Sequence, residues 1–389
     1  MSEPLFTSNQ AELPEAPHGS DRAVKDIKLT FKNILWPLFL SLVVLLLIGY
    51  FTFEPDAFRQ TVAQLDSWFV TAALITVVLR VVFGAWRFSY ISRGELGFVK
   101  GLRGQLAWDF FSNVTPAALG GGPFAAIFVA KDSDMQIGET TALVLFTILL
   151  DQLWSALMIP FILISAAYIA VIPPEIGSIG TLAVIGYFMA MLSWVAIFGY
   201  ATLFRPELIE RVSDRIFRIG FLKRFRKRVA SEMNKMSECA RMLRAQPPSF
   251  FSNAFLLTAA TWIPRYLLPV FIVLAVFSDL ESFLFFLRGI TMTVSSFIVP
   301  TPGGAGGIEG LYVLFLGPLM PKALVAPTLF IWRFLGYYIF VALGAFLFYK
   351  GKQRIEKKQE TATSKSESVQ KNFSFPTETP EPEFADSEE

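Results

Sequence analysis

The sequence predicts an all-α membrane protein: a polytopic helix bundle with about six full spans and two broken re-entrant helical hairpins. Three observations lead to this prediction. Hydrophobic residues make up 53% of the 389 residues and charged residues only 17%, whereas charged residues make up about a quarter of a soluble domain. The apolar residues gather in runs of about 20, the length at which a helix crosses a bilayer. The basic residues gather between alternate runs.

Both ends of the chain are polar, and we expect them to be disordered cytoplasmic tails. Residues 1–30 and 351–389 hold few large apolar side chains, so they cannot bury enough surface to offset the entropy of ordering them. The first apolar run begins near Ile34 and continues for a full span, which indicates a retained anchor rather than a cleaved signal. The membrane domain therefore covers residues 31–350.

The apolar runs that are long enough to span a bilayer alternate with basic and uncharged loops. Because Lys-rich and Arg-rich loops stay on the inner side, this alternation places both termini in the cytoplasm. We therefore expect a multi-pass protein of the cell membrane. The six runs are Ile34–Phe53, Trp68–Trp86, Thr140–Ala170, Thr181–Phe204, Phe250–Phe277 and Ala323–Tyr349.

Two further apolar stretches are interrupted and too short to be ordinary spans. The first, residues 105–130, is split by Gly120–Gly122, and the second, residues 283–320, is split by Pro300–Gly307. Irregular backbone at membrane depth is tolerated only inside protein or beside a wet cavity. We interpret both stretches as re-entrant hairpins, the first entering from the cytoplasm and the second from outside; a pair of kinked full spans is the alternative.

The two interruptions share a spacing. Thr115 and Thr301 each begin the pattern Thr-Pro-x-x-x-Gly-Gly. Breaks that enter from opposite faces are typical of an inverted repeat around a midplane site, as in secondary transporters. The alternative explanation is a chance match between two short glycine-rich segments. Proline ends a helix and glycine lets bare backbone approach a ligand. The half-helix N-termini that follow would attract an anion.

The residues around both interruptions resemble the signatures of a known family. Asn113–Pro123, followed by Lys131 and Gly138, resembles the first signature of the flippase-like family built on the transmembrane region of lysylphosphatidylglycerol synthase. Pro300–Glu309 resembles its second signature, a Pro-Gly-Gly loop that ends in a glutamate. The resemblance covers about residues 30–350 and implies the fold described above.

The same resemblance bears on function. Many members carry an acidic residue followed by an arginine at the positions where this chain has Gly122-Pro123 and Ala125-Ala126. Because of this difference, the resemblance indicates the family more firmly than it indicates the substrate. Since only a tail of about 40 residues follows the membrane part, we expect the aminoacyl-transferase domain of full-length synthases to be absent. The resemblance therefore implies translocation of a lipid or handling of a lipid-linked substrate, and not lipid aminoacylation.

Charged residues within apolar segments are costly and are candidates for function. Asp109 lies in the first half-hairpin, whereas Asp151 and Glu309 have no cation within a helical turn. Arg265 and Arg333 lie mid-span, where a guanidinium would bind phosphate in a bidentate manner or stack on neighbouring aromatic rings. We expect a carboxylate to meet one of these arginines and an anionic headgroup to compete for it. The predicted substrate-binding residues are Asn113, Thr115, Pro116, Gly120, Gly121, Gly122, Asp151, Arg265, Pro302, Gly303, Gly304, Gly306, Gly307, Glu309 and Arg333.

Three other arginines lie near membrane depth, and for two of them we expect structural roles. Arg80 and Arg87 lie toward the basic face, and we expect their long side chains to reach the lipid headgroups. For Arg288, a pair with Asp279 or Glu281 near the outer surface competes evenly with a functional role.

The basic segment 205–249 carries twelve Lys and Arg residues against five Asp and Glu residues. Its apolar periodicity predicts an amphipathic helix that is attracted to anionic inner-leaflet lipids; a solvated loop that only enforces topology is the alternative. Nucleic acid is not an expected partner, because the segment is tethered at a membrane.

The residue inventory narrows the possible chemistry. His18 is the one histidine and Cys239 the one cysteine, so we expect no metal site, no disulfide framework and no cofactor. The hydrolase elbow Gly-x-Ser-x-Gly and the zinc motif His-Glu-x-x-His are both absent from the sequence. We expect a flippase-like translocator of a phospholipid or lipid-linked anion, with no catalytic residues. An intramembrane enzyme acting on a lipid phosphate and a non-catalytic membrane assembly factor are the alternatives.

Overall fold

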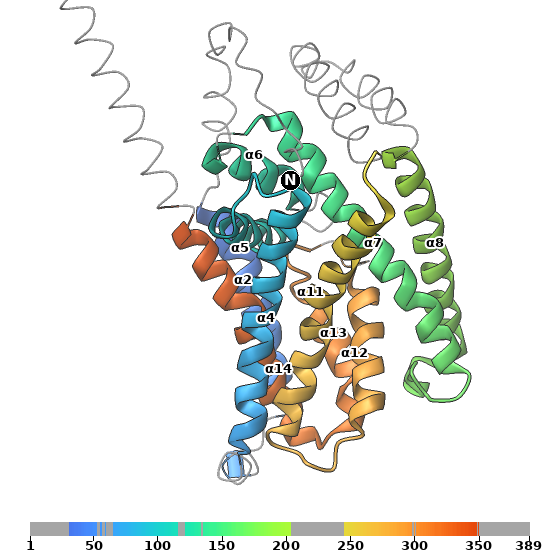
Figure 1. Ribbon diagram of the computed structural model, residues 1–389. Helices are drawn as coiled ribbons and strands as arrows, with labels where there is room; N and C mark the ends of the chain where they lie inside the picture. The colour runs from blue at the N-terminus through green and yellow to red at the C-terminus, as the bar shows by residue number, and fades with distance from the viewer. Residues whose placement is uncertain are drawn as a thin grey trace, which may run out of the picture. The chain divides into compact units, whose positions relative to one another are not determined.

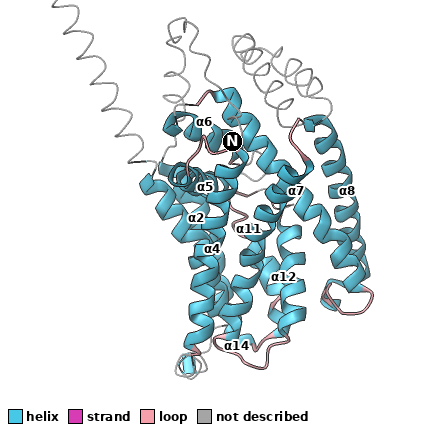
Figure 2. Ribbon diagram, viewed as in Figure 1, coloured by secondary structure: helices cyan, strands magenta, loops and turns pink. Residues whose placement is uncertain are grey.

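The computed structural model describes residues 31–52, 55–56, 59, 65–115, 121–133, 135–203, 245–297, 299, 301–347 and 349. Within these ranges the regular secondary structure is helical throughout (Figure 2), which confirms the prediction of an all-α polytopic bundle. The expected tails, residues 1–30 and 351–389, and most of the basic segment 205–249 lie outside the described residues. The chain divides into two units, Met1–Ala345 and Phe346–Glu389, and the helices below belong to the first.

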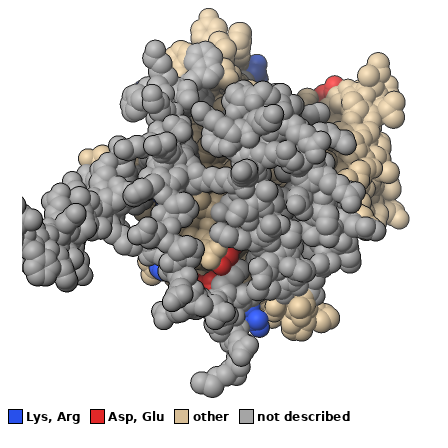
Figure 3. All heavy atoms as spheres, turned by 90° about the horizontal axis from the view of Figure 1, so that it is seen from above, with Lys and Arg blue, Asp and Glu red and all other residues tan. Residues whose placement is uncertain are grey.

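Among the described residues, five helices are long and apolar enough to cross a membrane, and they overlap the second to sixth expected runs. The first run forms helix α2, and the apolar stretch found in it, Phe39–Phe51, is shorter than a span. Seen from above, a few small, separate patches of charged side chains are visible (Figure 3). The long helices are α2 (Phe31–Thr52), α4 (Ser67–Ile91), α7 (Ile137–Ala166), α8 (Gly177–Leu203, preceded by the short turn Pro174–Ile176), α11 (Pro248–Leu274) and α14 (Lys322–Arg333, continued to Leu347).

Each interrupted stretch forms two short helices that pack against each other. In the first, Phe111 stacks on Phe124 and Arg103 pairs with Asp132, so the two helices run antiparallel. Helices of 17, 12, 15 and 9 residues fall short of a span. This geometry favours hairpins over kinked full spans. The four helices are α5 (Phe98–Val114), α6 (Gly122–Ser133), α12 (Ser282–Ser296) and α13 (Gly307–Phe315).

Helices α4 and α11 lie side by side and run antiparallel (Figure 1). At one end the N–H of Asp66 donates to the carbonyl of Ala275 at 2.9 Å, and at the other end Tyr90 stacks on Phe250. Each of these helices is followed by a hairpin and then by another long helix. The order of span, hairpin and span therefore occurs twice in opposite directions, as an inverted repeat requires.

Separate apolar clusters hold the two hairpins. Helices α4, α6, α7 and α11 bury one cluster that includes Phe88, Val129 and Phe146. Helices α11, α12, α13 and α14 bury another that includes Phe285 and Tyr312. Close packing of side chains is the main stabilising contact between helices in lipid. The polar residues carried by each hairpin are therefore held at fixed positions.

Candidate functional site

Buried charged side chains form three groups at membrane depth in the part of the chain that the structure describes. Each group joins an acidic residue of one helix to at least one arginine of another, as expected because an unpaired buried charge is costly. We name the groups by their acidic residues. They are the Asp109 cluster with Arg80 and Arg265, the Asp151 cluster with Arg87, and the Glu309 cluster with Arg333.

The Glu309 cluster is closed on all sides. Oε1 of Glu309 accepts hydrogen bonds from Nε of Arg333 at 2.8 Å and from the hydroxyl of Ser41 at 2.6 Å. Oε2 accepts from the backbone N–H of Gly306 at 2.8 Å, so the carboxylate caps the N-terminus of its own helix. The Glu309 side chain is fully buried. The expected contact between a carboxylate and a mid-span arginine is present here as a neutral pair.

An irregular turn positions the residues around Arg333. Helix α14 ends at Arg333, and Phe334–Tyr338 forms a π-helical turn, η4; such turns are frequent at functional sites. The hydroxyl of Tyr338 lies 2.9 Å from that of Ser41, and the hydroxyl of Tyr337 donates to the carbonyl of Asn113 at 3.5 Å. The turn therefore links the end of α14 to α2 and to the end of α5.

The two breaks contact each other. The carbonyl oxygen of Asn113, at the end of the first hairpin's α5, lies so close to Gly303 that a Cβ there would be 2.9 Å from it. The same Cβ would overlap the ring of Tyr337. On the other side, the carbonyl of Gly303 accepts from Nη1 of Arg333 at 3.3 Å. The structure thus brings Asn113, Gly303 and Arg333 together, although Asn113 and Arg333 are 220 residues apart in sequence.

The backbone of the second break requires glycine. The φ angle is 59° at Gly303, 67° at Gly304 and 86° at Gly306, in the left-handed region that glycine adopts without steric cost. In the first break, Gly121 lies so close to α5 that a Cβ would overlap the α5 backbone. The other described residues of the predicted set line the breaks, while Pro116 and Gly120 lie outside the described residues. Those described are Thr115, Gly122, Pro302 and Gly307.

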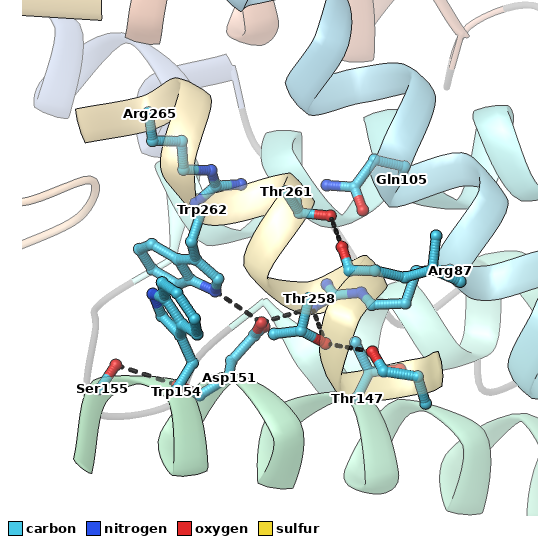
Figure 4. Close-up of polar contacts among 12 residues, drawn as sticks. Arg87, Gln105, Thr147, Asp151, Trp154, Ser155, Thr258, Thr261, Trp262 and Arg265 are labelled. Atoms are coloured by element: carbon cyan, nitrogen blue, oxygen red, sulfur yellow. Dashed lines mark hydrogen bonds and ion pairs between the residues drawn. The ribbon is translucent and has the colours of Figure 1, made fainter. Parts of the chain in front are cut away.

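The Asp151 cluster is also a neutral pair (Figure 4). Oδ1 of Asp151 accepts from Nη1 of Arg87 and from Nε1 of Trp262, the latter at 2.8 Å. Nη1 of Arg87 also donates to the hydroxyl of Thr258 at 3.4 Å. The expectation that Arg87 reaches the headgroups is wrong: its side chain is 2% exposed, because α7 offers it a carboxylate inside the bundle.

The Asp109 cluster differs because two guanidiniums share one carboxylate oxygen. Nη2 of Arg80 and Nη2 of Arg265 each lie 3.0 Å from Oδ1 of Asp109. Oδ2 accepts from Nε2 of Gln105 at 3.2 Å. With two cations and one anion, the cluster carries a net charge of one positive unit. Arg80 was expected to reach the headgroups, and this is also wrong, since its side chain is 9% exposed and its Nη1 donates to the carbonyl of Gly336 at 3.3 Å.

The three clusters adjoin. The guanidinium of Arg265 lies 4.8 Å from the ring centroid of Trp262, one turn earlier on α11, and Trp262 donates to Asp151. Both expected roles of Arg265, pairing and cation–π stacking, are therefore present. On the other side, Arg80 contacts Gly336 within the π-helical turn that follows Arg333. Polar contacts thus continue from one hairpin to the other.

Arg288 on α12 forms no pair with Asp279 or Glu281 in the structure. Its Nε and Nη2 donate to the carbonyl of Ala170 at 3.0 and 2.9 Å, and its Nη1 donates to the carbonyl of Phe315 at 3.3 Å. Carbonyls at helix ends lack intrahelical partners. Arg288 therefore joins α12 to the chain after α7 and to the end of α13.

Sequence reasoning left Asp109, Arg80 and Arg87 out of the binding set. One signal was present in the sequence: Arg80 and Arg87 are seven residues apart and therefore lie on one face of α4. That face packs on α11 and α5. The packing of α4 on these helices determines the partners of Arg80 and Arg87. The spacing of apolar residues does not reveal which face of α4 packs on other helices, because its lipid-facing surface is apolar as well.

The fold and the buried clusters define a polytopic α-helical membrane protein with charged groups inside its bundle. Residues 36–344 match the family described as the lysylphosphatidylglycerol synthase TM region, and the chain belongs to this family. It is also similar to a protein named "UPF0104 membrane protein" from Archaeoglobus fulgidus, with 20% identity over 260 residues, which are 64% of this chain and 76% of the relative. The resemblance seen at the two interruptions is confirmed.

Proposed function

We propose that this protein translocates an anionic phospholipid, or a lipid-linked anion, between the leaflets of a membrane. The observation that supports this most directly is the net positive charge of the Asp109 cluster. Charge at membrane depth is costly, and such residues commonly mark the path of a substrate or ion. The Asp151 and Glu309 clusters are neutral without a ligand, whereas an anion would neutralise the Asp109 cluster.

Two further features favour a translocation path. Arg265 has a side chain that is 25% exposed, the largest value among the paired residues of the three clusters, so a ligand has access to it. The contacts that link the clusters provide polar partners from one hairpin to the other. A headgroup that leaves water needs such partners, because an unsatisfied polar group in lipid is costly.

Reconstitution into liposomes tests the proposal. Fluorescent phosphatidylglycerol is placed in both leaflets, and a membrane-impermeant reductant then destroys the outer-leaflet signal. We expect protein-containing liposomes to lose the inner-leaflet signal as well, and to do so more slowly with phosphatidylcholine, whose headgroup carries no net charge. Signal loss that stops at the outer leaflet, as in protein-free liposomes, would contradict the proposed function.

We also propose that the protein lies in the cell membrane with both termini in the cytoplasm. The distribution of Lys and Arg residues supports this orientation, which turns the basic segment 205–249 toward the anionic lipids of the inner leaflet. The test introduces Ser20→Cys or Ser364→Cys into a chain that carries Cys239→Ser. We expect labelling by an impermeant thiol reagent only after the cells are opened, and labelling of intact cells would overturn the orientation.

A further inference from the structure

We propose that Arg265 binds the phosphate of a singly charged phosphodiester headgroup, and that Asp109 is an internal counter-ion which holds Arg265 until that phosphate arrives and then stays paired with Arg80. The assignment to a lipid headgroup rests on the proposed translocation. The binding of a phosphodiester at this place does not, and it is tested separately below.

The charge count selects the class of ligand. The cluster holds two guanidiniums and one carboxylate, so one negative charge makes it neutral. If a phosphodiester takes Arg265, then Asp109 keeps Arg80 and Gln105, and both resulting pairs are neutral. A phosphomonoester dianion would leave an excess negative charge, and a zwitterionic headgroup would bring a cation that has no carboxylate left to meet.

The cluster also has hydrogen-bonding capacity that the described residues do not use. Nε of Arg80 and Nε of Arg265 are buried without a hydrogen-bond partner among the described residues. A guanidinium has five N–H donors in a planar fork that matches the oxygens of a phosphate. Nε of Arg87 and Nη2 of Arg333 also lack a hydrogen-bond partner among the described residues. Both arginines belong to neutral clusters, their side chains are 2% and 5% exposed, and Nη2 of Arg333 lies 2.6 Å from Oε1 of Glu309.

The two arginines differ in how firmly they are held. Arg80 is 9% exposed, donates to the carbonyl of Gly336 and lies 4.1 Å from the ring centroid of Phe340. Arg265 is 25% exposed, and Asp109 is its hydrogen-bond acceptor. Arg265 is therefore the group that exchanges Asp109 for phosphate, while Arg80 keeps Asp109 neutralised in place.

A binding measurement on the full chain in uncharged detergent micelles tests this proposal. Dihexanoyl phosphatidylglycerol, a soluble phosphodiester, is titrated by calorimetry, with dihexanoyl phosphatidylcholine and inorganic phosphate as parallel ligands. We expect saturable binding of the phosphatidylglycerol. Arg265→Gln should weaken this binding about 10-fold or more, the loss expected when a charge-assisted hydrogen bond is removed. The variant keeps Asp109 paired with Arg80, so it should fold.

Arg103 offers a matched control. It pairs with Asp132 at 3.0 Å and is 22% exposed, so Arg103→Gln removes a positive charge of similar exposure outside the cluster. We expect it to bind like the wild type. If Arg103→Gln weakens binding as much as Arg265→Gln, the weakening reflects the overall charge of the protein, and the proposed site is overturned.

Asp109→Asn gives a second test, because removal of the competing carboxylate should tighten the binding of phosphatidylglycerol. If that variant does not fold, Arg265→Lys replaces it. This variant keeps the positive charge but lacks the planar guanidinium, and it should bind with intermediate affinity.

The outcomes separate the site from the function. Wild-type binding by Arg265→Gln would overturn the site even if liposomes translocate lipid. Binding that depends on Arg265 in a protein without translocation would keep the site and overturn the proposed function. Inorganic phosphate that binds as tightly as phosphatidylglycerol would identify the free anion as the ligand and overturn the headgroup assignment.

Discussion

The two broken hairpins carry one buried carboxylate each, and they neutralise it in different ways. In the first hairpin, Asp109 is shared by two arginines, one of which is 25% exposed. In the second, Glu309 meets one arginine, a serine hydroxyl and the N-terminus of its own helix, and it is fully buried. The second arrangement is complete without a ligand, and the first is not.

Position within each hairpin explains the difference. Glu309 lies in the first turn of α13, immediately after the break, so its carboxylate folds back onto the free N–H of Gly306. Asp109 lies inside α5, where its backbone neighbours are already hydrogen-bonded, and its cationic partners come from α4 and α11. A similar local architecture therefore supports a structural contact in one half and an open, charged cluster in the other.

The largest predicted effect comes from removing, in turn, an arginine that pairs with the buried carboxylate of each hairpin. Arg333→Gln leaves Glu309 buried without a cation, and we expect it to lower the free energy of unfolding by about 3–5 kcal/mol. Arg265→Gln leaves Asp109 with Arg80 and Gln105, and we expect a loss of no more than about 1 kcal/mol. Denaturant unfolding in micelles measures both, and equal losses would contradict the distinction between a closed and an open cluster.

The contact between the breaks gives the next prediction. Gly303→Ala introduces a Cβ that overlaps Tyr337 at a positive φ angle, and we expect a loss of about 2–4 kcal/mol in unfolding free energy. Gly304→Ala has the same kind of φ angle, but its nearest neighbour, Ile308, is 3.4 Å away, so about 1–2 kcal/mol is expected. If Tyr337→Leu does not recover part of the Gly303→Ala loss, the overlap is not the cause.

A smaller effect is expected from Ser41, which joins α2 to the second hairpin. Ser41→Ala removes a 2.6 Å hydrogen bond to Glu309, and the loss for a bond to a charged group is about 1.5–3 kcal/mol. Thermal unfolding of the variant in micelles checks this value. An unchanged midpoint would show that Arg333 and Gly306 are sufficient to hold the carboxylate.

The smallest effect is expected at the hydroxyl of Tyr337. Its distance of 3.5 Å to the carbonyl of Asn113 is at the limit for a hydrogen bond. Tyr337→Phe should therefore lower the unfolding free energy by less than about 1 kcal/mol, because the ring stays beside Arg333, 4.5 Å from its guanidinium. A loss comparable to that of Gly303→Ala would show that the hydroxyl, and not the packing of the breaks, joins the hairpins.

The helices and the breaks follow from the sequence because their causes are local. Apolar runs of span length predict α4, α7, α8 and α11, and the proline and glycine residues predict both interruptions. A pair between a buried carboxylate and Arg265 or Arg333 was also expected, since few cations lie at membrane depth, but the sequence did not say which partners would meet. The partners of Arg80 and Arg87 were missed because they depend on which helices pack together, a property of the tertiary structure. The net charge of the Asp109 cluster appears only once those contacts are known.

The preference for anionic over zwitterionic lipid tests the central claim most directly. Translocation of fluorescent phosphatidylglycerol and phosphatidylcholine is measured in liposomes that contain the wild type, Arg265→Gln or Arg103→Gln. If the first hairpin holds the anion site, Arg265→Gln will lose the preference for phosphatidylglycerol while Arg103→Gln keeps it. An Arg265→Gln protein that moves phosphatidylglycerol at the wild-type rate and with the wild-type preference would contradict the claim.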